Sequence, residues 1–231
     1  KPNFNLYPLY INKILKLKDI LDIGFENLIL RLIKKDKNNL VFKCISPGYL
    51  ETNKGVHLVN RKIKLHTLTP KDLECIVLAK RMNIKNFALS FTNSLDDIKK
   101  FKNLLPIQNR IYKIETSEAV KNFKKFVKFK KNFLIDRGDL SKDISIQKIP
   151  QTQRYLFDFK RKNKIEIAVA TNLLESMIKN PYPTRAEAND IYNSLEMGCN
   201  KLVLAGETAV GSYPSRCIDF IEEIIKVFKK N

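Results

Sequence analysis

Three charged side chains lie at the ends of two short apolar runs. Lys113 and Glu115 end the run at 110–115, and Asp139 ends the run at 132–139. Because alternate residues of a strand point to the same face, Lys113 and Glu115 are expected side by side. Two carboxylates without a neighbouring histidine suit a hard cation such as Mg²⁺, and a lysine beside that cation could neutralise a phosphoryl group or an enolate oxygen. An ordinary buried Lys–Glu pair is the alternative.

These charged residues belong to a repeating pattern of apolar runs and helical segments. A leading helix starts at Thr69 and Pro70, which suit an N-cap and a first helical position. Five apolar runs then follow, each succeeded by a helical segment, and we predict strands at 86–91, 110–115, 132–139, 165–171 and 201–207. Apolar strands joined by helices indicate an α/β fold whose parallel sheet is buried on both faces.

Polar residues interrupt these predicted strands at their carboxyl ends. They are Ser90, Lys113 with Glu115, Arg137 with Asp139, Thr171, and Glu207 with Thr208. Since the carboxyl ends of parallel strands meet at one edge, we expect one shared site there, as at the top of a (β/α)₈ barrel. A doubly wound sheet also binds ligands at this edge, but no Gly-x-Gly-x-x-Gly fingerprint favours it.

The sequence Asn-Pro-Tyr-Pro at 180–183 separates two helical segments. Each proline lacks a backbone N–H and restricts φ, so the first segment must end here. Thr184 and Glu187 then match a capping box, in which each side chain accepts a hydrogen bond from the other residue's backbone N–H. A new helix is therefore predicted at 184–197. Residues 1–66 differ, because short apolar runs and turn residues there indicate a small antiparallel β piece.

Composition limits the classes of function. The 231 residues are 44% hydrophobic, with 14 Phe and 8 Tyr, which is enough for a substantial core. Four scattered cysteines and only two histidines argue against zinc sites and His-based triads. The net charge of +19 permits an anionic partner. However, nucleic-acid binding is not expected without a matching motif, and no apolar run approaches the roughly 20 residues of a membrane span.

The loops at the predicted strand ends resemble, in order, the signature loops of the pyruvate kinase family. They read "RIYKIETSEAV", "LIDRGDL", "ATNLLESMIKNPYPTRAEANDI" and "LAGETAVGSYP". The resemblance runs from about residue 54 to 228 and implies a (β/α)₈ TIM-type barrel, with five βα units visible and the first three not found. Residues 13–58 resemble the latter part of the family's lid domain. We therefore expect a small β-rich lid-domain remnant at 1–58 and the second part of a pyruvate-kinase-like barrel at 59–231.

The resemblance also implies a role for each residue at this edge. Lys113 matches the lysine at the transferring phosphoryl group, and Thr171 matches the threonine tied to enolate protonation. Glu115 and Asp139 match the carboxylates that hold the divalent metal. The residues matched to substrate binding are Ser90, Phe91, Arg137, Gly138, Asp139 and Thr171.

The implied reaction is phosphoryl transfer between phosphoenolpyruvate and ADP through enolpyruvate, which depends mainly on positioning and charge neutralisation. Mg²⁺ or Mn²⁺ is the implied cofactor; K⁺ is implied by the family as well, although its pocket is not in this chain. The family further implies the cytoplasm or an organelle matrix. It also implies a homo-oligomer, or a partner chain that completes the barrel.

The sequence departs from the family near the expected site. Asp136 replaces a small residue, while Ala205 and Val210 replace a serine and a lysine at the nucleotide contacts. The acidic "DDG" of the lid reads "DIGFEN" at 22–27. Three hypotheses therefore stand: a divergent pyruvate kinase, a non-catalytic relative that acts as a binding or assembly subunit, and a Mg²⁺-enolate lyase on the same barrel.

Overall fold

The computed structural model of the chain describes residues 3–24, 27–37, 39–63, 65–129 and 131–230. Phe25 and Glu26, which belong to the "DIGFEN" stretch, lie outside the described residues. The chain divides into two compact units, Lys1–Asp72 and Leu73–Asn231. The domain boundary between residues 58 and 59, expected from the family, stays a prediction.

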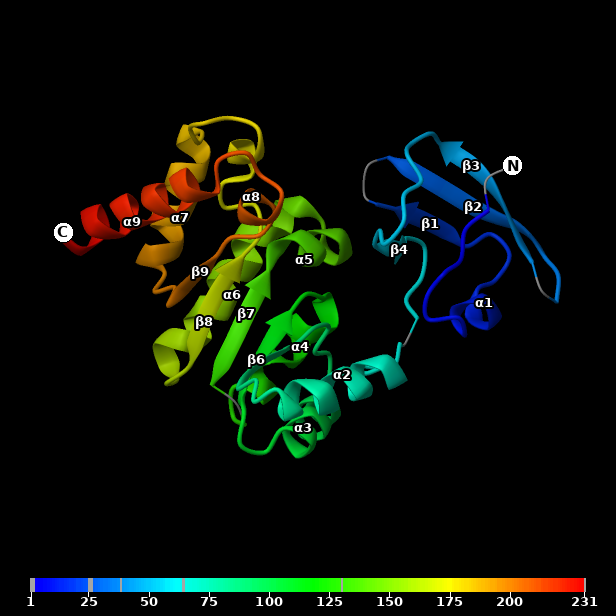
Figure 1. Ribbon diagram of the computed structural model, residues 1–231, viewed down its shortest axis with the longest axis horizontal. Coiled ribbons are helices and arrows are strands. Elements are labelled where there is room, and N and C mark those ends of the chain that lie inside the picture. The colour runs from blue at the N-terminus through cyan, green and yellow to red at the C-terminus, as the bar shows by residue number, and fades with distance from the viewer. Residues whose placement is uncertain (1–2, 25–26, 38, 64, 130, 231) are drawn as a thin grey trace. The chain divides into compact units, whose positions relative to one another are not determined.

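The first unit contains a four-stranded antiparallel sheet (Figure 1). A short helix precedes its strands, and the elements are α1 (Ile11–Ile14), β1 (Ile20–Ile23), β2 (Leu28–Lys35), β3 (Leu40–Ser46) and β4 (Val56–Leu58). The strand order is β3-β2-β1-β4. Leu21, Leu30 and Leu32 lie in its core, where alternate residues of β1 and β2 face inward. The antiparallel β piece predicted for this region is confirmed.

The second unit is built on a five-stranded parallel sheet in the order β5-β6-β7-β8-β9. Its strands are β5 (Asn86–Leu89), β6 (Asn109–Ile114), β7 (Asn132–Asp136), β8 (Glu166–Ala170) and β9 (Lys201–Val203). The spatial order equals the chain order, and β6 pairs directly with β7. Both the parallel sheet and the α/β class predicted from the sequence are confirmed.

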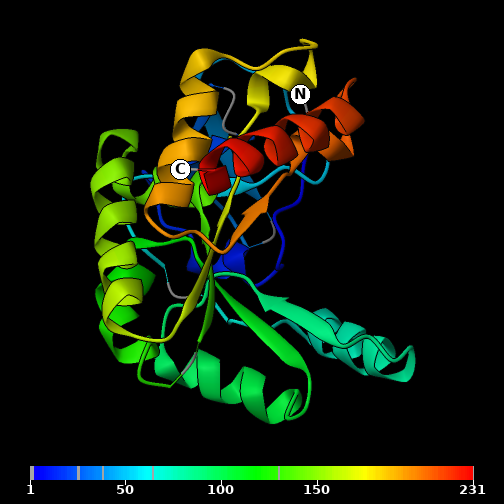
Figure 2. The ribbon, with the colours of Figure 1, turned by 90° about the vertical axis from the view of Figure 1, so that its left-hand side faces the viewer.

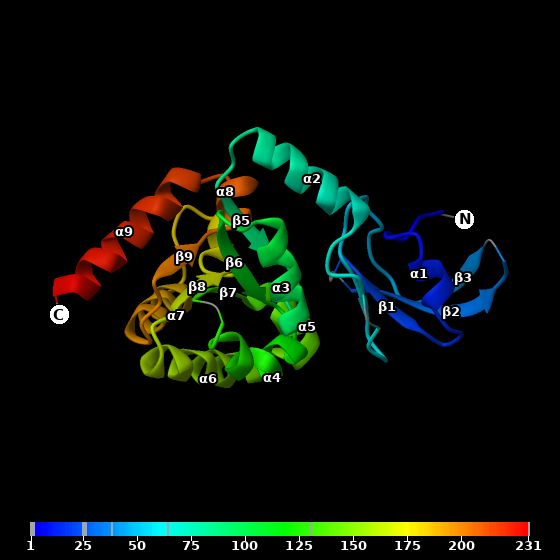
Figure 3. The same ribbon diagram turned by 90° about the horizontal axis from the view of Figure 1, so that it is seen from below.

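Helices follow the strands, as predicted. They are α2 (Pro70–Arg81), α3 (Leu95–Leu104), α4 (Ser117–Phe126), α5 (Arg137–Ile144), η1 (Ile146–Lys148), α6 (Ile149–Lys162), η2 (Glu175–Ile178), α7 (Arg185–Glu196), α8 (Gly206–Ala209) and α9 (Pro214–Lys230). Figure 3 shows α4 and α6 along one face of the sheet. The aromatic ring of Phe123 on α4 packs 4.8 Å from that of Phe133 on β7, measured between centroids. No described helix is long and apolar enough to cross a membrane.

Two strands end three or more residues before the predicted position, and β5, β6 and β8 end one or two residues before it. The run at 132–139 ends as a strand at Asp136, because α5 begins at the next residue. The run at 201–207 ends as a strand at Val203, and its last residues enter the helical turn α8. Glu207 on this turn accepts hydrogen bonds from the backbone N–H groups of Leu174 and Ala205, which stabilise the turn in place of a longer strand.

The face of the sheet that α4 and α6 leave uncovered carries small and aliphatic side chains. Leu134, Ala168 and Ala170 are buried there, with Ile111 and Val203 packed against them. Strand residues two apart share a face, so this face continues at the carboxyl ends into the charged side chains of β6 and β7. Because side chains alternate between the two faces of a strand, the charged residues lie on the same face as these buried apolar side chains, at its carboxyl end.

Within the described residues the parallel sheet is not closed, because β5 and β9 form its two edges. Both edge strands are more exposed than β7 and β8, which are buried along almost their whole length. This is the pattern of an open sheet whose central strands carry the core.

The capping box predicted at Thr184 and Glu187 is present at the start of α7. The Glu187 carboxylate also accepts hydrogen bonds from the backbone N–H and the hydroxyl of Ser176 on η2, at 2.8 and 2.6 Å. One side chain therefore joins η2, which follows β8, to the beginning of α7. Helix α7 in turn packs beside α9 (Figure 2), where the rings of Tyr192 and Phe228 meet edge to face.

We predict that Glu187→Gln lowers the free energy of unfolding by about 1 kcal/mol at neutral pH, because glutamine can keep the capping hydrogen bonds but not their charged acceptor, and a hydrogen bond to a charged group is worth about 1 kcal/mol more than one to a neutral group. Although burial alone would raise it, hydrogen bonds from Ser176 and Thr184 hold the pKa of Glu187 below its ordinary value. The stabilisation is therefore present above the pKa of the unfolded state and is lost as the pH falls through the lower pKa of the folded state. Urea unfolding across this pH range measures the difference.

The matched control is Glu196→Gln, at the exposed carboxyl end of the same helix. Its stability should stay at or slightly above that of the wild type, because a negative charge at a helix C-terminus is unfavourable. A Glu187→Gln deficit that persists unchanged at acid pH would contradict the prediction.

Candidate functional site

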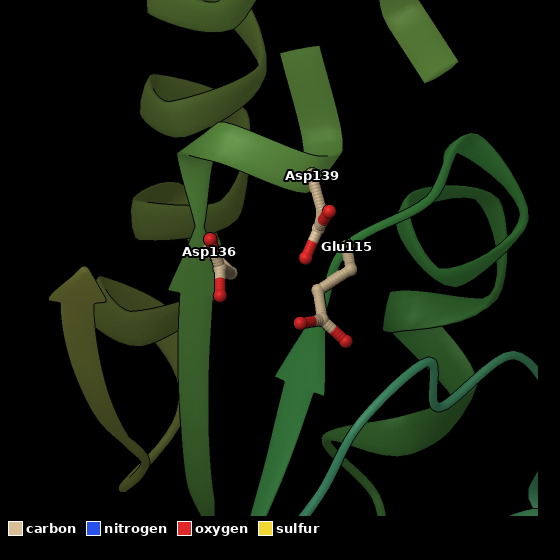
Figure 4. A group of neighbouring side chains, drawn as sticks. All are labelled: Glu115, Asp136 and Asp139. Carbon is tan, nitrogen blue, oxygen red and sulfur yellow. The ribbon is translucent and has the colours of Figure 1, made fainter. Parts of the chain in front are cut away.

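Three carboxylates meet at the carboxyl edge of the parallel sheet. Glu115 follows β6, Asp136 ends β7 and Asp139 lies in the first turn of α5. One oxygen from each lies within 4.8 Å of the others. Figure 4 shows Asp139 extending towards Glu115, with Asp136 beside them at the end of its strand. Glu115 and Asp136 are buried, and Asp139 is half-buried.

Lys113 is held between two of these carboxylates. Its Nζ lies 2.6 Å from Glu115 Oε1 and 2.9 Å from Asp136 Oδ2. Lys113 pairs in register with Leu134, so Asp136, two residues further along β7, lies on the same face. The other oxygen of Glu115 accepts a hydrogen bond of 2.5 Å from the backbone N–H of Phe91.

Protonation within this cluster is governed by burial and by mutual charge. Burial alone would lower the pKa of Lys113, but its hydrogen bonds to Glu115 and Asp136 raise the pKa above its ordinary value, so Lys113 is an ammonium. Burial raises the pKa of Glu115 despite the opposing effect of Lys113. Burial also raises the pKa of Asp139, and the charge of Asp136 adds to the rise. Because three carboxylates share one ammonium, the cluster has an excess of negative charge when all three are ionised.

Thr171, directly after β8, brings a hydroxyl to the same edge. Its Oγ1 accepts a hydrogen bond of 2.8 Å from the backbone N–H of Gly138. It lies 2.6 Å from the carbonyl oxygen of Ala170 and 3.2 Å from Asp136 Oδ1, the two acceptors for its single proton. Thr171 adopts a left-handed backbone with φ of 68°, which is uncommon for a β-branched residue.

Arg137 holds the turn that contains this threonine. Its buried guanidinium donates to the carbonyl oxygens of Thr171 and Asn172 and pairs with Asp190 on α7 at 2.6 Å. The side chain of Arg137 therefore supports the turn, and its charge is balanced by Asp190. Its backbone begins α5, next to Gly138.

The remaining predicted residues lie at the margins of the cluster. Ser90 and Phe91 are exposed, and Phe91 reaches the cluster through its backbone N–H. Ala205 lies in the loop after β9, and Val210, directly after α8, is 80% exposed. The structure thus brings together Lys113, Glu115, Asp139 and Thr171. Within the described residues, the side chains of Ser90, Ala205 and Val210 form no hydrogen bond or ion pair with this cluster.

Two side-chain ion pairs around this cluster were not predicted from the sequence. One is the pairing of Asp136 with Lys113, although the alternation of residues along β7 indicates that Asp136 shares a face with Leu134. The other is the pairing of Arg137 with Asp190, which lies 53 positions away. No local pattern in the sequence signals that contact.

The donor set of the cluster suits a hard divalent cation. All three side chains offer carboxylate oxygens, which Mg²⁺ and Mn²⁺ prefer, and none offers sulfur or imidazole. Their separation places one oxygen from each around a common centre. The residues present therefore fit the metal that the sequence implied.

Comparison with known proteins places the chain in a family. A family model described as "Pyruvate kinase, barrel domain" matches residues 10–218. A pyruvate kinase of Dictyostelium discoideum is 32% identical over 88% of this chain. Those of Methanocaldococcus jannaschii and Geobacillus stearothermophilus are 34% and 31% identical over 78% and 94% of it.

The chain spans only part of these relatives: the matched regions make up 41%, 41% and 38% of their respective lengths. The matches to this chain, in contrast, cover most of its residues, including the strands that end at Ile114, Asp136 and Ala170. Both the family model and the identities above 30% show that this chain belongs to the pyruvate kinase family.

Proposed function

We propose that this chain carries the metal- and enol-handling part of a divergent pyruvate kinase, which transfers a phosphoryl group between phosphoenolpyruvate and ADP. One observation supports this most: Lys113, the Glu115–Asp139 carboxylate pair and Thr171 converge from three strands at one edge of the sheet. Family membership supplies the reaction, and the convergence supplies the groups that the reaction needs.

The proposal includes the architecture. The five βα units form an arc of a (β/α)₈ barrel at 59–231, and the antiparallel sheet within 1–58 is the lid-domain remnant. The open edges at β5 and β9 support an arc that other strands complete, either from a longer chain or from a partner in an oligomer. By analogy with the family, the protein acts in the cytoplasm or an organelle matrix, with K⁺ bound by residues outside this chain.

Glu115 and Asp139 would hold Mg²⁺ or Mn²⁺. The cation would supply positive charge opposite the enol oxygen and the phosphoryl group. Phe91 orients Glu115 through its backbone N–H, which fixes one carboxylate oxygen and leaves the other facing the cluster. The hydrogen bond from Phe91 would thus orient Glu115 as a metal ligand, as hydrogen bonds to metal-binding side chains commonly do.

The chain's own residues provide the remaining functions. The Lys113 ammonium neutralises negative charge on the phosphoryl group as it is transferred. The Thr171 hydroxyl is held at the same edge, where it can exchange a proton with the methylene carbon of the enol. The carboxylate of pyruvate would bind the backbone at Arg137 and Gly138, at the beginning of α5. The N–H of Gly138 donates to Thr171 Oγ1 in the structure, so this donor would be shared with the carboxylate or released to it.

Nucleotide binding is the weaker half of the proposal. Val210 is apolar and exposed, so it offers no charge to a phosphate, and Ala205 offers no hydroxyl. A single lost charge-assisted contact costs about 1.5–3 kcal/mol, or roughly ten- to a hundred-fold in affinity or rate. Chemistry on the enol should therefore survive better than transfer to ADP.

We predict that the chain binds Mn²⁺ and that Glu115→Gln weakens this binding at least about tenfold, because an amide replaces an anionic ligand. Isothermal titration of both proteins measures the change. Glu118→Gln, an exposed carboxylate in the first turn of α4, is the matched control and should bind Mn²⁺ like the wild type. Equal affinity in wild type and Glu115→Gln would remove Glu115 from the metal site.

We further predict that the full-length protein exchanges the methyl protons of pyruvate more readily than it makes ATP. Proton exchange needs the metal, Lys113 and the group at Thr171, whereas ATP synthesis also needs the contacts altered at Ala205 and Val210. Deuterium uptake into pyruvate, measured beside a coupled ATP assay on one preparation, compares the two. The isolated 231-residue chain should show little of either activity.

Lys113→Met should lower the exchange rate by roughly ten- to a hundred-fold, since it removes the ammonium from the edge. Lys121→Met, at an exposed position on α4, is the control and should keep the wild-type rate. ATP synthesis with ordinary ADP affinity would show that the changes at Ala205 and Val210 are neutral. Absence of both activities in a full-length, metal-bound protein would favour a non-catalytic role.

A further inference from the structure

Asp136 occupies the centre of the charged cluster. It ends β7, the middle strand of the sheet, and lies between Lys113 from β6 and Thr171 after β8. Its Oδ2 lies 2.9 Å from the Lys113 ammonium and its Oδ1 lies 3.2 Å from the Thr171 hydroxyl. The side chain of Asp136 is 10% exposed, so solvent does little to screen its charge.

The charges in direct contact at this edge do not balance. Glu115, Asp136 and Asp139 contribute three carboxylates, and Lys113 contributes one ammonium. Arg137 adds no free charge, because its guanidinium is paired with Asp190. When the three carboxylates are ionised, the cluster therefore has a formal charge of −2, and a divalent cation brings it to zero.

We propose that Asp136 sets the order of binding at this site, because its charge strengthens binding of the divalent cation and weakens binding of the anionic substrate. This inference rests on the metal site of the proposed function. Without Asp136 the same site would have a formal charge of −1 when empty and +1 when loaded with metal. With Asp136, the empty site has a formal charge of −2 and repels an anion. The metal-loaded site has a formal charge of zero and does not attract one.

A second effect of Asp136 concerns the position of Lys113. A cation that Glu115 holds competes with the ammonium for the same carboxylate, because Glu115 Oε1 is the oxygen that Lys113 contacts. Asp136 is the other anionic partner of Lys113 and keeps the ammonium at the edge when Glu115 turns to the metal. Asp136 is thus a positioning residue: its carboxylate holds Lys113, which leaves the carboxylate of Glu115 for the metal.

The test compares Asp136→Asn with the wild-type chain in two binding measurements. Asparagine keeps the size of the side chain and an oxygen near Thr171 but removes the charge. Isothermal titration with Mn²⁺ should show binding at least about tenfold weaker, the size of one lost charged contact. Titration of the Mn²⁺-saturated protein with oxalate, a doubly charged enolate analogue, should show binding several-fold tighter, since the loaded site gains a positive charge.

Two further variants separate charge from structure. Asp136→Glu keeps the charge and should restore most of the Mn²⁺ affinity. Asp158→Asn removes one charge from the exposed surface of α6 and should leave both affinities unchanged. Thermal unfolding of each variant, followed by circular dichroism, shows whether the fold is intact.

The opposite signs of the two changes are the decisive result. If Asp136→Asn weakens the binding of both Mn²⁺ and oxalate, or leaves both affinities unchanged, Asp136 does not set the order of binding. The metal site of the proposed function stands in that case. If the wild-type chain binds no Mn²⁺ at millimolar concentrations, the metal site itself is wrong and this inference fails with it. If the affinities move in opposite directions and Asp136→Glu restores the first, the inference holds.

Discussion

The compensation of buried charge at the edge of the parallel sheet is the interaction on which the site depends. An isolated ion buried among apolar strands is costly, and it persists only with partners of opposite charge and hydrogen bonds. Lys113 has such partners because the register of β6 against β7 places it diagonally from Asp136, while Glu115 follows two residues further along its own chain. The parallel pairing of strands thus determines which charges meet.

A second layer of contacts keeps this edge in shape. The guanidinium of Arg137 donates to the carbonyl groups of the turn at Thr171 and Asn172, and Asp190 on α7 balances its charge. The same helix is joined at its first turn to η2 through Glu187. Arg137 therefore holds the turn at Thr171 directly, and Glu187 holds η2, which follows that turn. A loop without these contacts would not fix the Thr171 hydroxyl beside Asp136.

The sequence predicted the parallel sheet and most helix starts because these features arise from local patterns. Apolar runs of strand length and the capping signal at Thr184 and Glu187 contain the needed information within a few residues. Long-range partners were not predictable in the same way: nothing near Arg137 points to Asp190, and the contact of Phe91 with Glu115 is made by a backbone N–H that every residue type possesses. The ends of β7 and β9 were predicted too late, because the sequence does not show that α5 begins at Arg137 or that Glu207 stabilises the turn α8.

The left-handed backbone of Thr171 has a consequence for how this position can vary. A β-branched residue at φ of 68° carries a conformational cost of about 1–3 kcal/mol, which the hydrogen bonds from Arg137 help to offset. Glycine would adopt the same conformation without that cost. Selection for thermal stability alone would therefore favour glycine here, whereas a requirement for the hydroxyl would favour threonine. Stability and a requirement for the hydroxyl thus make opposite demands on the residue at 171.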